Sequence, residues 1–303
     1  MTPSLAKRAV KALIPKEYHF AVRSTGYRMI HFGLDRFCRC CRSGVRAFKP
    51  FGPVAPRPNA QCPVCGALER DRLVALYLER HPGLLAGARR VLHVSPERPI
   101  AYLLQRGVVV DYVSIDIAEG AAMETMDLTA LAFEDGRFDA VYCSNVLEHV
   151  AEDRKAMEEI RRVLRPGGWT MILVPLYGET THEDLSITDP AERTRLYGQP
   201  DHVRAYGIDV AERLAAAGLE VHVERPALGL PESEILRQGL HIHEIVFFCR
   251  KPERAAAVPW RVPDNVVPPF GRQPALRNRY SRSFVAARLR ADAPAREREP
   301  AQL

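Results

Sequence analysis

Strand-like and helix-like segments alternate through the middle of this chain, and the alternation restricts the possible folds more than any other feature of the sequence. Apolar, β-branched runs predict buried strands at residues 90–94, 111–116, 138–145, 169–176, 219–225 and 243–250. Helical spacing of apolar residues predicts helices at 151–164 and 209–218. This pattern is typical of a mostly parallel sheet covered by helices on both faces. We therefore predict a doubly wound α/β fold, whose ligands bind at the carboxyl ends of the strands.

Four cysteines form two Cys-x-x-Cys pairs with 20 residues between them: Cys38, Cys41, Cys62 and Cys65. This spacing is typical of a four-thiolate zinc site, and such a closed site folds a small ribbon rather than catalysing a reaction. Cys40 leaves a second pairing with Cys38 open. Cys143 and Cys249 fall in predicted strands and are expected to be buried thiols. A helix predicted at 67–81 would brace the ribbon.

The charge of the chain is distributed unevenly. Residues 1–49 carry a net charge of +9 and residues 250–303 carry +7, whereas residues 50–249 carry −10. Basic ends can bind RNA or the surface of an anionic membrane, or they can be solvated tails. No apolar run is long enough for a transmembrane segment, and charged residues interrupt any signal-peptide core near the start. We therefore expect a cytoplasmic protein, in a reducing compartment where paired cysteines bind metal.

Composition and pattern divide the chain into four segments. A basic N-terminal segment (1–34) precedes the zinc ribbon and its bracing helix (35–82). The strand–helix alternation occupies residues 83–252. Within it, a polar insert at 178–207 is too long for a plain connection and is predicted to form a lid. Residues 253–303 are rich in Pro, Arg and Ala, and this composition predicts a disordered basic tail.

Acidic residues follow two of the predicted strands at positions suited to binding a nucleotide. Asp116 ends the second strand, where a carboxylate can hold ribose hydroxyl groups. Asp127 follows a short third strand, where it could accept a hydrogen bond from the amino group of adenine. The fourth strand ends at Asn145.

Two longer phrases, FEDGRFDAVYCSNVLEHV and EEIRRVLRPGGWTMILVP, resemble the class I S-adenosylmethionine-dependent methyltransferases with a type 11-like domain. The resemblance spans about residues 89–251, and it is strongest to members that carry an N-terminal CxxC…CPxCG segment. It implies a seven-stranded Rossmann-like sheet, binding of S-adenosylmethionine, and transfer of its methyl group. It also implies cofactor contacts from Asp116, Asp127 and Asn145.

The first loop departs from the pattern of that family. His93 stands in place of the usual acid, while Ser95, Glu97 and Pro99 stand where the family has glycines. A Cβ atom restricts positive φ angles and close approach to a ligand. Either the loop takes a different path or cofactor binding is weakened. We expect His93 and Ser95 to face the cofactor, and Glu97 to accept from its ammonium group, although Glu97 also suits a helix N-terminus.

Methyl transfer requires in-line positioning and, for a hydroxyl or amine acceptor, a base. His149 and His202 are the predicted catalytic residues, and His182 is a further candidate; each could instead be a structural hydrogen-bonding group. Arg204 and Tyr206 are predicted either to bind an anionic or sugar-like acceptor or to pack the lid.

These observations predict a methyltransferase that acts on a small-molecule or glycan-type acceptor. One alternative is an RNA methyltransferase that uses the zinc ribbon and basic ends, but few aromatic residues accompany those charges as stacking platforms for bases. A second alternative is a non-catalytic scaffold that has lost cofactor binding, which the altered first loop would support.

Overall fold

The computed structural model describes residues 19–52, 56–106 and 111–253. The predictions for residues 1–18 and 254–303, which include most of the basic tail, lie outside the described residues. The chain falls into two compact units. The first unit takes its residues from Met1–Arg89, Pro96–Tyr112 and Arg225–Val246, and the second from Arg90–Ser95, Val113–Glu224 and Phe247–Leu303.

Seven strands form one sheet in the order β13-β14-β9-β8-β5-β6-β7. Their bounds are β5 Arg90–Val94, β6 Asp111–Asp116, β7 Glu124–Thr125, β8 Phe138–Ser144, β9 Leu164–Leu173, β13 Glu220–Glu224 and β14 Val246–Arg250. β5 pairs with β8, β8 with β9 and β6 with β7 in parallel, while β14 pairs with β9 antiparallel. The strand order reverses between β5 and β8, which confirms the predicted doubly wound, mostly parallel sheet.

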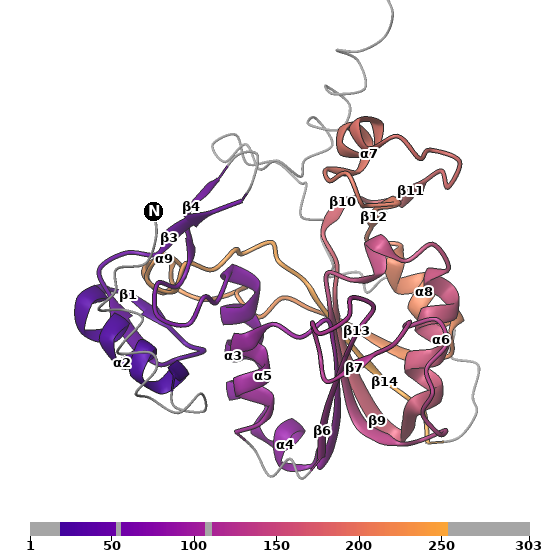
Figure 1. Ribbon diagram of the computed structural model, residues 1–303, viewed down its shortest axis with the longest axis horizontal. Helices are drawn as coiled ribbons and strands as arrows, with labels where there is room; N and C mark the ends of the chain where they lie inside the picture. Colours follow the sequence, from indigo (N-terminus) through magenta and orange to yellow (C-terminus); the bar gives the residue numbers. More distant parts are fainter. Residues whose placement is uncertain (1–18, 53–55, 107–110, 254–303) are drawn as a thin grey trace, which may run out of the picture. The chain divides into compact units, whose positions relative to one another are not determined.

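The second unit builds its core on the central strand β8, in which all seven residues are buried. A strand covered on both faces loses the alternation of apolar and polar residues, as FDAVYCS illustrates. Helix α6 (Asp153–Val163) buries Ala156, Met157, Ile160 and Val163. In Figure 1, α6 lies beside helix α8 (Val210–Ala216) on one side of the sheet.

The largest difference from the predicted boundaries lies at the start of strand β9. Strand β9 begins at Leu164, directly after α6, rather than at Trp169. Its register against β8 jumps from Leu164 to Trp169, so the residues between the predicted helix and the predicted strand form an irregularity within the strand. Gly167 has a φ of +72°, a left-handed conformation that costs glycine little. Gly167 therefore allows the chain to bulge between Leu164 and Trp169 and to continue in the same strand.

The predicted lid region folds as a small sheet of its own, in the order β10-β12-β11. It contains β10 (Leu176–Gly178), β11 (His182–Glu183), helix α7 (Pro190–Tyr197) and β12 (Arg204–Gly207). Asp189 caps α7 by accepting a hydrogen bond from the amide of Glu192 at 2.8 Å, which satisfies a donor that the helix leaves unpaired. The insert is therefore an ordered element of the second unit.

The first unit contains two hairpins, β1-β2 and β3-β4, together with five helices among its described residues. Their bounds are α2 His19–His31, β1 Phe32–Cys38, β2 Ser43–Val45, β3 Lys49–Phe51, β4 Arg57–Gln61, α3 Glu69–Arg80, α4 Pro82–Ala86, α5 Arg98–Leu104 and α9 Glu232–Gln238. Helix α3 confirms the helix predicted at 67–81. None of the helices in the described part of the chain is both long and apolar enough to cross a bilayer.

Candidate functional site

Two non-glycine residues adopt left-handed backbone conformations directly after neighbouring parallel strands of the second unit. Ser95 follows β5 with a φ of +48°, and Asn145 follows β8 with a φ of +54°. Each is held by a backbone hydrogen bond of 2.8 Å, from Ser95 N–H to the carbonyl of Ile115 and from Asn145 N–H to that of Leu173. Strained backbone of this kind clusters at ligand sites, and these two positions flank the point where the strand order reverses.

The conformation of Ser95 answers the question raised by the missing glycines. The backbone takes the left-handed turn that a glycine would allow, although it carries a Cβ atom. A left-handed residue other than glycine costs about 1–2 kcal/mol, and the rest of the second unit must offset that cost. The turn at the end of β5 is therefore formed with a serine at the position where the family has a glycine.

Asp116 is the last residue of strand β6, and Asp127 lies in the turn that follows strand β7. Oδ1 of Asp116 accepts from the amide of Ala118 at 2.8 Å, and Oδ1 of Asp127 accepts from the amide and hydroxyl of Thr129 at 2.8 and 2.9 Å. Within the described residues, no protein donor contacts Oδ2 of either carboxylate. Each acid is thus held by one oxygen and retains an acceptor for a ligand.

His93, Glu97 and Asn145 have identifiable local contacts. His93 is fully buried on β5, and its ring meets that of Tyr142 edge to face, with centroids 5.1 Å apart. Glu97, in the first unit, is the N-cap residue of α5, and its Oε1 lies 3.9 Å from Nη2 of Arg70. Oδ1 of Asn145 accepts from the Ser144 hydroxyl at 3.2 Å. The cofactor roles predicted for these residues remain predictions.

The predicted catalytic residues His149 and His202 come together in the second unit although 53 positions separate them. His149 ends the short 3-10 helix η2 (Leu147–His149), and His202 lies two residues before strand β12. Their ring centroids lie 4.7 Å apart at an interplanar angle of 84°. The amide of Val203 donates to the carbonyl of Glu148 at 2.9 Å. This hydrogen bond holds the residues just before β12 against η2.

The environment of His202 determines where its proton lies. Nδ1 is 3.0 Å from the carbonyl oxygen of Tyr197, so Nδ1 carries the hydrogen and donates it. Burial, together with the nearby ring of His149, lowers the pKa of His202 to about 4. The imidazole is therefore neutral at pH 7, with its lone pair on Nε2. In the described part of the protein that buried Nε2 atom meets no hydrogen-bond partner.

Asp201 contacts the other histidine. Its Oδ2 lies 3.2 Å from Nδ1 of His149, so the carboxylate orients His149 rather than its sequence neighbour His202. The third histidine considered, His182, is exposed on β11 and lies outside the group formed by His149, His202 and Glu148.

The side chains of Arg204 and Tyr206 are both at most 1% exposed. Arg204 donates to the carbonyls of Leu147, Val150 and Ala151 and to Glu183. The hydroxyl of Tyr206 donates to Oδ2 of Asp153 at 2.7 Å. These contacts favour the packing role over the acceptor-binding role, because the donors of Arg204 are already paired within the chain.

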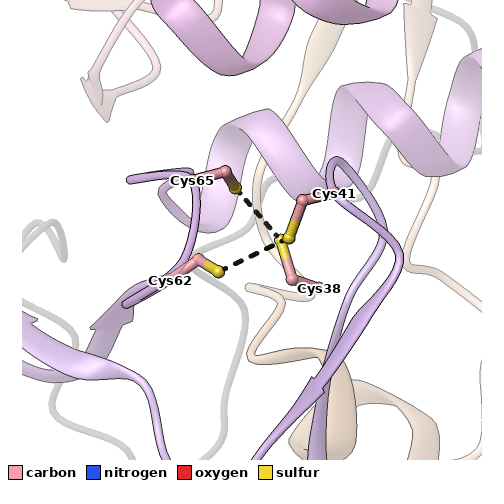
Figure 2. A group of neighbouring side chains, drawn as sticks. All are labelled: Cys38, Cys41, Cys62 and Cys65. Carbon is pink, nitrogen blue, oxygen red and sulfur yellow. Dashed lines mark hydrogen bonds between the residues drawn. The ribbon is translucent and has the colours of Figure 1, made fainter. Parts of the chain in front are cut away.

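A second side-chain group lies in the first unit, where the sulfur atoms of Cys38, Cys41, Cys62 and Cys65 all lie within 4.8 Å of one another. Figure 2 shows the four side chains converging on one point. The Cys38–Cys65 and Cys41–Cys62 sulfur separations are 3.7 and 3.8 Å. A tetrahedral zinc ion with 2.3 Å bonds requires sulfur atoms about 3.8 Å apart. The structure thus assembles the predicted set of four, without Cys40.

Several residues of these sites have no signal of their own in the sequence. Tyr197 contacts His202 through its carbonyl and Asp201 contacts His149 through its carboxylate. Glu148 lies in the same group, and nothing local in the sequence marks these three residues. The adjacency of Glu148 and His149 at the end of a predicted strand was the one available hint.

Comparison with known proteins agrees with the fold. Residues 94–172 match the family described as "Methyltransferase domain". An uncharacterised 37.1 kDa protein of transposon TN4556 from Streptomyces fradiae is 30% identical over 45% of this chain and 38% of its own length. A demethylmenaquinone methyltransferase from Paenarthrobacter aurescens is 41% identical over 25% of this chain and 32% of its own. A ubiquinone biosynthesis O-methyltransferase from Paraburkholderia xenovorans is 39% identical over 22% of this chain and 24% of its own.

Among solved structures, a methyltransferase from Mesorhizobium loti is 14% identical, covers 59% of this chain and 97% of its own, and superposes with a TM-score of 0.45. The chain spans well under half the length of each curated relative it matches. Residues 94–172 therefore carry the similarity to a methyltransferase domain, and the order and direction of the strands agree with the predicted doubly wound fold.

Proposed function

We propose that this chain transfers a methyl group from S-adenosylmethionine to a small-molecule acceptor. The observation that carries the proposal is the edge of the second unit's sheet. There Ser95 and Asn145 make strained turns, and no donor from the described residues contacts Oδ2 of Asp116 or Asp127. Doubly wound sheets bind ligands at this edge.

The two acids have distinct roles in this proposal. Asp116, at the end of β6, accepts hydrogen bonds from the ribose hydroxyls through Oδ2 while Oδ1 remains on the amide of Ala118. Asp127 accepts from the amino group of adenine, and its own turn with Thr129 fixes its direction. Hydrogen bonds to a charged acceptor are stronger than neutral ones, so these carboxylates account for a large part of cofactor affinity. Contacts from His93 and Glu97 remain secondary expectations.

The acceptor class rests on two relatives whose names describe demethylmenaquinone and ubiquinone-biosynthesis methyl transfer. By analogy we favour a small molecule with a hydroxyl group or a reactive ring carbon over a glycan. His149 is the better placed of the two histidines to contact such an acceptor, because its side chain is 34% exposed and Asp201 orients the ring.

The test begins with calorimetric titration of S-adenosylmethionine and of its demethylated product into the full chain. We expect saturable binding of both, followed by transfer of a labelled methyl group in a screen of quinone precursors, phenols and sugars. A wild-type protein that binds neither compound at about 1 mM, an affinity of only about −4 kcal/mol, would replace the enzyme with the scaffold alternative.

We also propose that the four-cysteine group holds one structural zinc ion. The matching sulfur separations support it, as does the burial of Cys38, Cys41 and Cys62. Four thiolates fill the tetrahedral coordination of zinc and leave no position for a substrate. The ion would therefore stabilise the first unit and take no part in methyl transfer.

A further inference from the structure

We propose that Glu148, His149 and His202 form a binding site for a divalent transition-metal ion in the second unit. One ligand atom from each of the three residues lies within 4.8 Å of the other two. The group is distinct from the four cysteines, because it belongs to the other unit and offers nitrogen and oxygen rather than sulfur.

The strongest observation is the Nε2 atom of His202. The residue is 0% exposed. A buried polar atom without a hydrogen-bond partner destabilises the folded state, and such atoms are rare in native proteins. Because Nδ1 donates to the carbonyl of Tyr197, Nε2 presents a lone pair rather than a hydrogen. A metal-bound histidine almost always donates its other ring N–H in this way, which fixes the tautomer and the ring orientation.

His149 repeats that arrangement with a carboxylate in place of the carbonyl. Asp201 lies 3.2 Å from Nδ1 of His149, and a hydrogen on Nδ1 leaves the lone pair on Nε2. In many metal sites a histidine binds the metal through one ring nitrogen and donates the N–H of the other to a carboxylate. Both histidines are thus prepared as ligands by partners that the chain itself supplies.

Glu148 completes the set with a carboxylate that is 1% exposed. Bonds of about 2.1 Å to a tetrahedral ion require ligand atoms roughly 3.4 Å apart, a spacing that lies within the 4.8 Å limit of the group. His149 can adjust its position on binding, because its side chain is partly exposed at the end of η2.

Two imidazoles and one carboxylate suit zinc, iron(II) or manganese(II), and three protein ligands leave coordination positions open. A role for the open positions in methyl transfer rests on the proposed function. An acceptor hydroxyl bound at an open position would lose its proton to solvent more readily. Its oxygen would then bond to the methyl carbon as the carbon–sulfur bond breaks, leaving the neutral thioether product.

Manganese(II) is the probe for the test, because it prefers oxygen and nitrogen ligands and avoids thiolates. Electron paramagnetic resonance of free Mn²⁺ during titration of the full chain should show one bound ion per chain. His149→Ala should weaken that binding at least about tenfold, since even outer-shell partners contribute about 10–100-fold to metal affinity. His202→Gln and Glu148→Gln should do the same. His182→Ala is the matched control and should bind Mn²⁺ as the wild type does. It removes an exposed histidine of the insert at 178–207, which also contains His202.

The titration measures Mn²⁺ binding and does not depend on methyl transfer. A protein that binds Mn²⁺ but transfers no methyl group would contradict the proposed function and leave the metal site standing. Wild-type protein that binds no Mn²⁺, or a His149→Ala variant with wild-type affinity and an unchanged melting temperature, would overturn the metal site. If His202→Gln fails to fold, His149→Ala and Glu148→Gln decide the outcome.

Discussion

The guanidinium of Arg72 donates from Nε to the backbone carbonyl of Gln238 at 2.6 Å, joining helix α3 to the end of α9 across 166 positions of sequence. Arg72 is 0% exposed, and its remaining donors go to the carbonyls of Ala60, Ala67 and Gly239. A single buried side chain therefore joins a β4 residue, the loop after the second cysteine pair and the α9 terminus within the first unit.

We expect Arg72→Lys to lower the free energy of unfolding by at least about 2 kcal/mol, because a lysine cannot reach all four carbonyls and each orphaned buried acceptor costs roughly 1–3 kcal/mol. Chemical denaturation followed by circular dichroism measures this loss. Arg98→Lys, at an exposed position of α5, is the control and should change stability by less than about 0.5 kcal/mol. Equal behaviour of the two variants would contradict the bracing role of Arg72.

Purified protein should contain at least one zinc ion per chain by elemental analysis, held by the four-cysteine group. Cys62→Ser should lower the zinc content and the melting temperature together, because metal binding is coupled to folding. Cys143→Ser alters a buried thiol on β8 and should leave the zinc content unchanged. A metal-free protein that melts at the same temperature would exclude a structural ion.

Asp116→Ala should weaken S-adenosylmethionine binding by about tenfold to a hundredfold, since a hydrogen bond to a charged group contributes roughly 1.5–3 kcal/mol. Asp116→Asn should cost less, because the amide keeps one acceptor and the shape. Isothermal titration calorimetry gives both affinities. The free energy of unfolding should change little, because the carboxylate lies at the partly exposed end of β6 rather than in the core. Wild-type affinity in Asp116→Ala would remove this residue from the cofactor site.

Glu159 on α6 provides a pH-dependent prediction. It accepts from Arg162 and from the amide of Leu131, and these hydrogen bonds lower its pKa below the usual 4.5. A lowered folded-state pKa contributes stability that is fully present above about pH 4.5 and is lost as the pH falls through the folded-state value. Asp135, which also pairs with Arg162, opposes the shift.

Glu159→Gln should therefore destabilise the protein by about 1 kcal/mol at pH 7, a modest value because solvent screens a partly exposed pair. The difference from wild type should shrink as the pH falls below 4.5. Denaturant unfolding of both proteins at several pH values tests the prediction, with Glu158→Gln on the same helix as control. A difference that stays constant from pH 7 down to pH 3 would show that the charge of Glu159 contributes nothing.

Much of the second unit could be predicted from sequence because its signals are local. The segments predicted at 90–94 and 111–116 coincide with β5 and β6. In β5 four of the five residues are buried, and a strand covered on both faces imposes its composition residue by residue. The helix predicted at 151–164 is observed at Asp153–Val163. The irregular start of β9 escaped prediction, because a Pro-Gly-Gly segment reads as a turn whether the chain leaves the sheet or bulges within it.

Local patterns were enough to predict the doubly wound sheet, the helix after the second cysteine pair and the set of four cysteines, because hydrophobic periodicity and ligand spacing involve residues close in the chain. Contacts between distant segments place Asp201 against His149, fix the tautomer of His202 through Tyr197, and pair the donors of Arg204 with carbonyls of another segment. The left-handed turn at Ser95 belongs to the same class, because its local sequence disfavours it. These features depend on contacts between residues distant in sequence, and the energy that imposes them comes from the packed unit rather than from any local pattern.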